Sequence, residues 1–144
     1  GFDDVSTFIA SGNVIFRTSG RASEMEAAAE AALRDALGFE VVTFVRTAPA
    51  ISRVVGASPF ADADDSTHVG FLKKAPGAAV RSALDALGND SDSVTATGKE
   101  VYWLARSGMG RATISGATIE KKLGQPTTFR SLKMLKRLDA KLRA

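Results

Sequence analysis

The order of two apolar periodicities along the chain limits its possible folds more than any other feature. Apolar residues recur at every second position in some segments, as in strands, and at every third or fourth in others, as in helices. The predicted order is β-β-α-β-α-β-α-β-β-α-α, without the strict strand–helix repeat of a doubly wound parallel sheet. We therefore expect an α+β fold, a sandwich of helices on a mostly antiparallel sheet that ends in two C-terminal helices.

The first half of the chain reads as a hairpin, a helix, a strand and a short helix. Residues 5–11 and 14–17 flank a Gly-Asn turn, which predicts the hairpin. Ser23 and Glu26 form a capping-box pattern for a helix that Gly38 ends. The β-branched and aromatic residues 39–46 predict a strand, and residues 47–56 a short helix.

The second half begins after a polar loop at residues 61–66. A strand at 68–72 precedes a helix that starts at Pro76 and ends before Gly88. A second hairpin is expected around Thr97-Gly98-Lys99. Two helices close the chain at 117–123 and 127–142, separated by a glycine and a proline.

Composition removes several classes of chemistry. The 144 residues include no cysteine and one histidine, His68, so disulfides and cysteine nucleophiles are excluded and zinc sites are poorly supplied with ligands. The aspartates at 62, 64 and 65 lack the glycine and terminal glutamate of a calcium loop. We expect no metal, no cofactor and no catalytic residue. No apolar run is long enough to cross a bilayer, and residue 1 onward carries no secretory signal, so a cytoplasmic location is expected.

Positive charge gathers at the end of the chain. Residues 121–144 carry eight basic side chains and one acidic one, whereas the first 120 residues have a net charge of −4. Helical spacing places the apolar residues of the last helix on one side and its basic residues on the other. The basic side is either a solvated helix face or a surface for a phosphate backbone. Its candidate ligand residues are Thr127, Arg130, Lys133 and Arg137.

Two glycine-containing loops are further candidates for anion binding. Ser11, Gly12 and Asn13 form a tip whose backbone N–H groups suit a phosphate, although turn geometry alone also explains a Gly-Asn pair. Gly108, Gly110 and Arg111 lie between a strand and a helix but lack a complete dinucleotide or P-loop motif. Nothing in the sequence brings Ser11 and His68 together as a nucleophile and its base.

Three segments together resemble the DUF1697 family of bacterial proteins of unknown function. They are Thr7 to Phe16, which contains Ser-Gly-Asn-Val, then Glu100 to Trp103, and Thr127 to Ser131. Family members usually begin earlier, with a strand and a helix, so this chain resembles a member without that first strand–helix unit. The resemblance implies a ferredoxin-like architecture of two related βαβ-type halves in one domain over residues 1–144, with approximate halves 1–60 and 66–144. It implies no activity.

These observations favour a binding module over an enzyme. The expected partner is anionic, either nucleic acid or a phosphorylated small molecule, and no membrane partner is expected. Two alternatives stay open: an enzyme of unknown reaction that needs the family's glycine-rich N-terminal loop, and a protein-interaction scaffold that uses an exposed sheet edge. The oligomeric state is not predicted.

Overall fold

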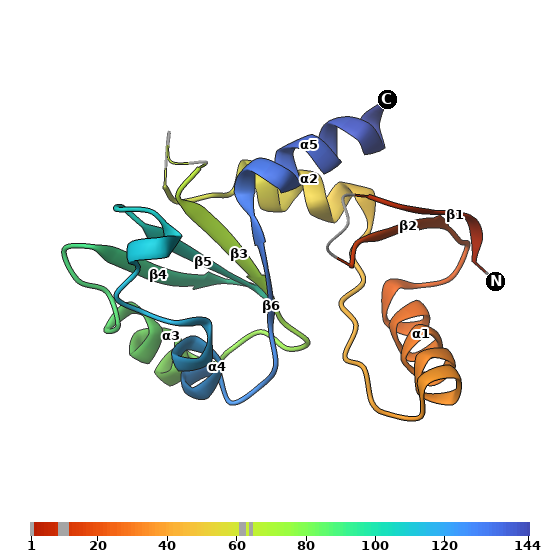
Figure 1. Cartoon of the computed structure of the whole chain (residues 1–144), viewed down its shortest axis with the longest axis horizontal. Helices are drawn as coiled ribbons and strands as arrows, with labels where there is room; N and C mark the ends of the chain where they lie inside the picture. Colours follow the sequence, from red (N-terminus) through yellow and green to blue (C-terminus); the bar gives the residue numbers. More distant parts are fainter. Residues whose placement is uncertain (1, 9–11, 61–62, 64) are drawn as a thin grey trace. The chain divides into compact units, whose positions relative to one another are not determined.

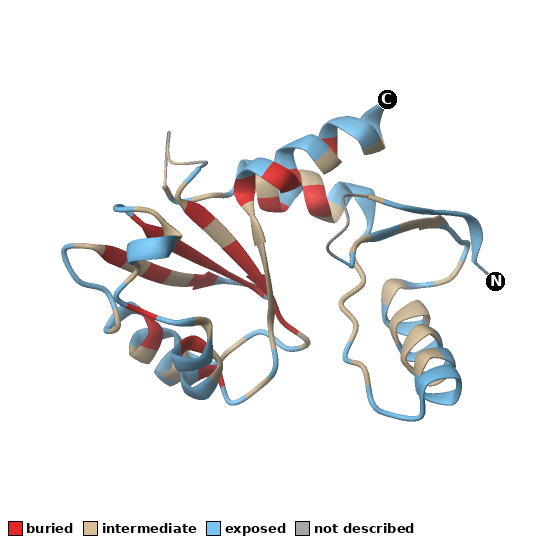
Figure 2. Ribbon diagram, viewed as in Figure 1, coloured by how far each residue is buried: buried red, intermediate tan, exposed pale blue. Residues whose placement is uncertain are grey.

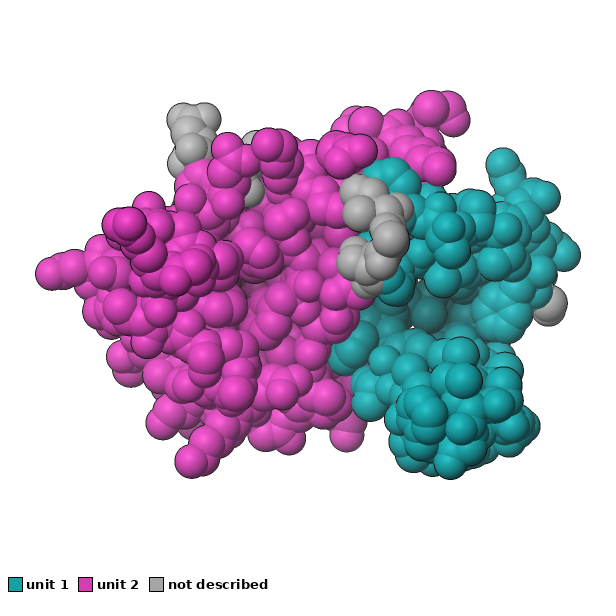
Figure 3. All heavy atoms as spheres, in the orientation of Figure 1, with its two compact units in different colours: residues 1–47 teal, residues 48–144 magenta. Residues whose placement is uncertain are grey.

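The computed structural model describes residues 2–8, 12–60, 63 and 65–144. The chain divides into two compact units, residues 1–47 (unit 1) and residues 48–144 (unit 2), which have different colours in Figure 3. The predicted halves divided the chain after residue 60, whereas here the short helix at 48–56 groups with the later residues.

Unit 1 contains a hairpin and a helix. Strands β1 (Asp3–Thr7) and β2 (Val14–Arg17) pair antiparallel, with a register shift between Asp3 and Ser6. Helix α1 (Ala22–Leu37) follows, and Gly38 ends it in the left-handed conformation at φ 79° (Figure 1). The helix starts at Ala22, and the Arg21 N–H donates to the Glu24 carboxylate. The Ser23–Glu26 capping box predicted from the sequence is therefore displaced toward the N-terminus.

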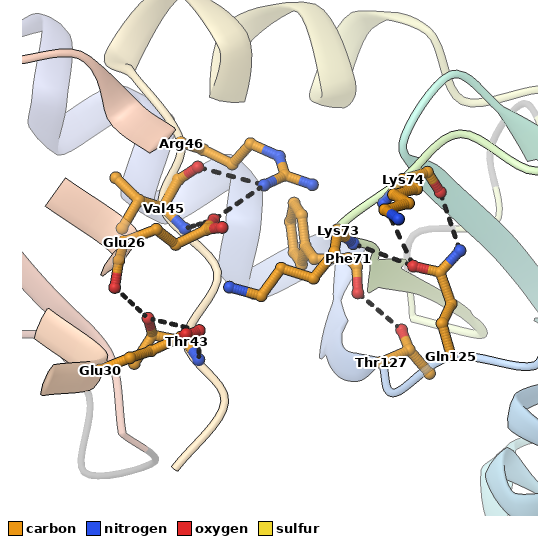
Figure 4. Close-up of polar contacts among 10 residues, drawn as sticks. All are labelled: Glu26, Glu30, Thr43, Val45, Arg46, Phe71, Lys73, Lys74, Gln125 and Thr127. Carbon is orange, nitrogen blue, oxygen red and sulfur yellow. Dashed lines mark hydrogen bonds and ion pairs between the residues drawn. The ribbon is translucent and has the colours of Figure 1, made fainter. Parts of the chain in front are cut away.

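An extended segment, not a strand, follows α1. Residues 40–47 form no β ladder, so the strand predicted at 39–46 is wrong. The N–H of Thr43 donates to the Glu30 carboxylate at 2.9 Å, and that of Val45 donates to the Glu26 carboxylate at 2.7 Å (Figure 4). Two residues of extended chain span about 6.6 Å and four residues of helix rise about 6 Å, so the spacings match. Carboxylates of α1 thus bind amides that a neighbouring strand would otherwise bind.

Unit 2 is built on a four-stranded antiparallel sheet in the order β4-β5-β3-β6. Strand β3 (Thr67–Phe71) lies between β5 (Glu100–Ala105) and β6 (Thr128–Ser131), and β4 (Asp92–Thr97) pairs with the far edge of β5. The α+β class with mostly antiparallel pairing, predicted from the sequence, is confirmed.

Helices α3 (Ala78–Asp85) and α4 (Gly116–Leu123) cover one face of this sheet (Figure 1). A short 3-10 turn, η1 (Met109–Arg111), connects β5 toward α4. The main core lies under these elements, where Val101 and Trp103 of β5 meet apolar side chains of both helices (red in Figure 2). The other core members are Leu72, Leu84, Val94, Ala96, Ile114, Ile119 and Leu123.

Helices α2 (Ala48–Gly56) and α5 (Leu132–Arg143) pack against each other, and α5 also contacts β3. Tyr102 points to this side because residues alternate along β5. Its hydroxyl donates to the Val54 carbonyl of α2 at 2.8 Å. The predicted helix at 127–142 is correct only from residue 132, because residues 128–131 pair with β3 as a strand.

The absence of a side chain at Gly70 lets the side chains of Phe129 and Thr127 lie close to the backbone of β3. An added Cβ would lie 2.7 Å from the Phe129 ring and 2.8 Å from the Thr127 hydroxyl oxygen. The Phe129 ring in turn packs edge-on against Trp103 with centroids 5.5 Å apart. We expect Gly70→Ala to overpack the sheet and lower the free energy of unfolding by about 1–3 kcal/mol in urea denaturation. Gly56→Ala is the control, since nothing lies within 4 Å of its Cβ; equal stability of the two variants would contradict this packing role.

Tyr102 gives a second prediction because it is the single tyrosine of the chain. Burial, with a contribution from the charge of Glu100, raises its pKa to about 12, against an opposing effect of Arg53. Phenolate absorbance at 295 nm should therefore titrate near pH 12 in the folded protein and near 10 in urea. Because the folded pKa is the higher one, stability present below pH 10 is lost as the pH rises toward 12. Tyr102→Phe should reduce this alkaline loss; a folded-state midpoint near 10 would contradict the burial.

Candidate anion-binding surface

Strand β6 continues directly into helix α5, which fixes the basic residues of both. Ser131 is the last residue of β6 and the N-cap of α5, and its hydroxyl accepts the Met134 N–H at 3.1 Å. No loop separates Arg130 on the strand from Lys133 in the first helical turn. The positions of these side chains are therefore set by the sheet.

Helix α5 has an apolar side and a basic side, as its helical spacing predicts. Leu132, Met134 and Leu135 are buried. The basic residues on the opposite side are exposed, and a charged face at the surface keeps its hydration while the apolar face supplies the packing energy. They are Lys133, Lys136, Arg137 and Lys141, which we call the α5 basic surface.

Two described carboxylates, those of Asp139 and Asp65, pair with basic residues of α5. Asp139 is the only carboxylate of α5; it is 2% exposed and is bonded to the Ser52 hydroxyl and to Arg143. Lys133 pairs with Asp65 at 3.1 Å, but both side chains are more than two-thirds exposed, so the pair contributes little. Arg137 forms no ion pair with any described residue.

Arg130 is half-buried beside this surface on the edge strand β6. Its guanidinium donates to the Thr128 hydroxyl at 2.7 Å and to the Phe129 carbonyl at 2.8 Å. Burial lowers the pKa of Arg130 from its ordinary value, yet a guanidinium remains charged at neutral pH. Bonds to its own strand orient this cation and reduce the entropy that a ligand would have to overcome.

Thr127 contributes to the fold rather than to this surface. Its hydroxyl donates to the Phe71 carbonyl at 2.9 Å, and its N–H donates to the Glu120 carboxylate at 2.8 Å. The structure thus brings Arg130, Lys133 and Arg137 into one continuous strand–helix segment, with Thr127 at its start as a structural anchor.

Backbone donors next to the loop with Gly108, Gly110 and Arg111 form hydrogen bonds within the protein. Gly108 has a φ of 87° and Arg111 is exposed. The neighbouring N–H groups of Thr113 and Ile114 both donate to one oxygen of the buried Asp92 at 2.9 Å. Because these amides already bind a carboxylate, the loop has fewer donors for an external anion than its glycines suggest.

The tip with Gly12 and Asn13 lies in unit 1, and Ser11 falls outside the described residues. The Asn13 side-chain amide donates to the Phe8 carbonyl at 3.2 Å, and the Phe8 N–H donates to the Asn13 carbonyl at 3.1 Å. Gly12 has a φ of 81°, which favours glycine. These bonds close the hairpin turn.

One further polar cluster in unit 2 was not predicted from the sequence. The side-chain oxygen of Gln125 accepts the N–H groups of Lys73 and Lys74 at 3.1 and 3.2 Å, and its amide donates to the Lys74 carbonyl (Figure 4). One glutamine thereby ties the loop after β3 to the loop before β6. A glutamine more than fifty residues distant carries no local pattern that could reveal this contact.

His68 sits on β3 across from Trp103, with ring centroids 6.5 Å apart. Burial lowers the pKa of His68 from its ordinary value, so the imidazole is neutral at pH 7. Its Nδ1 atom and the Trp103 indole N–H make no hydrogen bond to any described residue. Within the described residues there is also no group of three or more side chains suited to hold a metal ion.

The chain belongs to the family described as "Protein of unknown function (DUF1697)", whose pattern matches residues 1–102. That match confirms the resemblance seen in the sequence. None of the curated proteins matches this chain. Across the described residues, no helix has both the length and the apolar character needed to cross a membrane.

A solved structure has a similar fold. It is titled "The structure of conserved bacterial protein SP0830 from Streptococcus pneumoniae", and it matches with a TM-score of 0.70 and 15% sequence identity. The match covers 100% of this chain and 83% of that one. At this identity the likeness establishes the shared fold alone.

The carboxylate of Asp92 holds the backbone that follows the loop with Gly108, Gly110 and Arg111. We expect Asp92→Ala to leave the Thr113 and Ile114 N–H groups without an acceptor and to lower the free energy of unfolding by about 1–3 kcal/mol. Amide exchange of both residues, measured by NMR, should quicken. Asp90→Ala is the control, because Asp90 is exposed and lies two residues away. Unchanged exchange in Asp92→Ala would contradict the role of these hydrogen bonds.

Proposed function

We propose that this chain is a binding module for an anionic ligand that carries several phosphate groups, such as a nucleic-acid backbone. The carrying observation is the α5 basic surface: its cations are exposed, whereas the only carboxylate of the helix is buried and bonded to Ser52 and Arg143. A surface of this kind attracts phosphates over roughly a Debye length, about 8–10 Å at physiological salt.

The charge of unit 2 as a whole supports the proposal. Residues 48–144 contain fifteen basic and nine acidic side chains, a net charge of +6, while residues 1–47 contain four and seven, a net charge of −3. Three of the acidic side chains in unit 2 are buried, namely Asp92, Glu100 and Asp139. The surface of unit 2 is therefore more basic than its sequence total.

The spacing of the basic residues favours a ligand with several phosphates over one with a single phosphate. Lys133, Arg137 and Lys141 recur at intervals of four residues, which places successive charges about 6 Å apart along the helix. Arg130 precedes them on β6. A row of cations gives a polyphosphate many weak contacts, whereas one phosphate needs a closed cradle of donors.

Two more specific expectations, about the fold of unit 2 and the location of the protein, belong to the same proposal. The β-α-β-β-α-β order of β3 to β6 and the sheet order β4-β5-β3-β6 support a ferredoxin-like split motif in unit 2. A chain of 144 residues without cysteine is also suited to the reducing cytoplasm, where we propose that it acts.

The test is fluorescence anisotropy of labelled single- and double-stranded oligonucleotides over a salt series. Each phosphate contact contributes about −0.7 to −0.9 to the slope of log K against log salt. We expect the combined change Lys133→Ala, Lys136→Ala and Arg137→Ala to reduce that slope by about 2–3 and to weaken binding at low salt. Far-ultraviolet circular dichroism should show an unchanged fold, because all three side chains are exposed.

A matched control separates the α5 basic surface from net charge. Lys74→Ala, Lys121→Ala and Lys122→Ala together remove the same charge from exposed positions of unit 2 outside α5. These changes should leave most of the slope intact. An equal loss in both triple variants would show a response to net charge only, and no binding at low salt by the unchanged protein would refute the proposal.

A further inference from the structure

The sheet of unit 2 has two edge strands, and they differ in charge. Strands β4 and β6 stand at the two ends of the order β4-β5-β3-β6 (Figure 1). Strand β6 carries Arg130, and a charged side chain within an edge strand discourages pairing with another chain. Residues 93–97 of β4 are Ser-Val-Thr-Ala-Thr, which include no charged residue and no proline. Strands β4 and β5 keep one register along their whole length, so β4 presents a regular edge to a partner.

One hydrogen bond shows which backbone groups of β4 point away from β5. The Arg106 N–H donates to the Ser91 carbonyl at 2.9 Å, next to the pair that starts the ladder. Along an antiparallel pair, residues that bond across the pair alternate with residues whose N–H and C=O groups point outward. The odd-numbered residues of 91–97 therefore bond to β5, and the even-numbered residues direct their backbone groups to the outer edge.

Two of the outward residues have their backbone groups open to a partner. The N–H of Asp92 donates to the Asn89 side chain at 2.9 Å, and its carbonyl accepts the Asn89 N–H at 2.8 Å. The outward groups of Val94 and Ala96 bond to none of the described residues. These two residues thus present N–H donors and carbonyl acceptors in one row.

We propose that two copies of this chain pair antiparallel along β4 and join their sheets into one. A twofold axis beside Thr95 places each Thr95 opposite the Thr95 of the second copy. Val94 then lies opposite Ala96 of the second copy, and such a pair exchanges both of its main-chain hydrogen bonds. Because Val94 and Ala96 are buried on the core side of the sheet, the intervening Thr95 lies on the other side, where it is half-buried.

This register uses all of the open groups, and its neighbours do not. A shift by one residue would place core-facing side chains opposite outward-facing ones. An axis beside Val94 would set Ala96 opposite Asp92, whose backbone groups already bind Asn89. An axis beside Ala96 would set Val94 opposite Gly98, which lies in the turn after β4 at φ 59°. The axis beside Thr95 is therefore the one that the backbone supports.

The side chains and charges at this edge are self-complementary. Two threonines that face each other across adjacent strands make a favourable pair. Asp90 precedes β4 and Lys99 follows it, and both are exposed. Antiparallel pairing brings the Asp90 end of one strand beside the Lys99 end of the other. Opposite charges therefore meet at both ends of the paired strands, which favours a second copy as the partner.

The paired sheet leaves the α5 basic surface open to a ligand. Helix α5 follows β6, and β6 lies at the opposite edge of the sheet from β4. Two copies would thus carry one α5 basic surface at each end of the joined sheet. Pairing along one short strand buries a small area, so we expect a weak dimer whose population rises with concentration.

The first test uses the absence of cysteine from the chain. Facing residues that are not hydrogen-bonded to each other have Cα atoms about 4.5 Å apart, which suits a disulfide. Thr95→Cys should therefore form a disulfide-linked dimer under mild oxidation. Ser93→Cys is the matched control, because Ser93 of the second copy would lie about 13 Å away along the strand. We expect about ten times more linked dimer from Thr95→Cys than from Ser93→Cys.

A mixture of two variants tests the register further. The proposed pairing sets Ser93 of one copy opposite Thr97 of the other. Ser93→Cys and Thr97→Cys should each stay largely unlinked alone and should link to each other when they are mixed.

The second test is sedimentation equilibrium over a range of protein concentrations. The unchanged chain should show a reversible dimer. Thr95→Lys should shift the protein to monomer, because two like charges would face each other across the axis. Thr95→Val is the control: it keeps the branched shape without a charge and should dimerise like the unchanged chain. Far-ultraviolet circular dichroism should show the same fold for both variants.

Three outcomes would overturn the inference. The first is a chain that stays monomeric at every concentration, even one that binds an added strand-forming peptide, since the partner would then not be a second copy. The second is a dimer that Thr95→Lys does not weaken, which would place the contact on another surface. The third is equal linkage of Thr95→Cys and Ser93→Cys, which would exclude this register.

Discussion

The rest of unit 2 depends on the pairing of β3 along both of its edges. Five residue pairs join β3 to β5 and four join it to β6, so every other part of the sheet is placed through this strand. Its faces serve different layers: Val69 and Phe71 lie on the side of α2 and α5, and Gly70 faces Phe129 on the side of α3 and α4. Loss of β3 would separate β6 from β5.

The candidate surface is a consequence of that pairing. Strand β6 is short, and it exists because β3 binds its backbone. Helix α5 begins where β6 ends, and its apolar side is buried while its lysines and Arg137 face solvent. The proposed anion-binding role therefore rests on a sheet edge that positions a helix.

Several features followed directly from the sequence. The class, the two hairpins, the ends of α1 and α4 at left-handed glycines and the two sides of α5 all come from interactions between residues close in the chain. Two predictions were wrong because a partner distant in the sequence determines the local structure. Residues 39–46 have the composition of a strand, yet they form none, because their amides at Thr43 and Val45 bind glutamates of α1. Residues 128–131 were predicted as the start of the last helix, yet they pair with β3 as a strand.

The sequence by itself determined the family, the α+β class and the concentration of positive charge in the last twenty-four residues, because these depend on residue identity and local spacing. Only the tertiary structure decided which polar groups are used internally. Thr127, Asn13 and the loop with Arg111 were all candidates in the sequence, and each forms bonds within the fold. The reason is physical: a backbone carbonyl or a buried carboxylate brought near by folding satisfies a donor that would otherwise be open to a ligand.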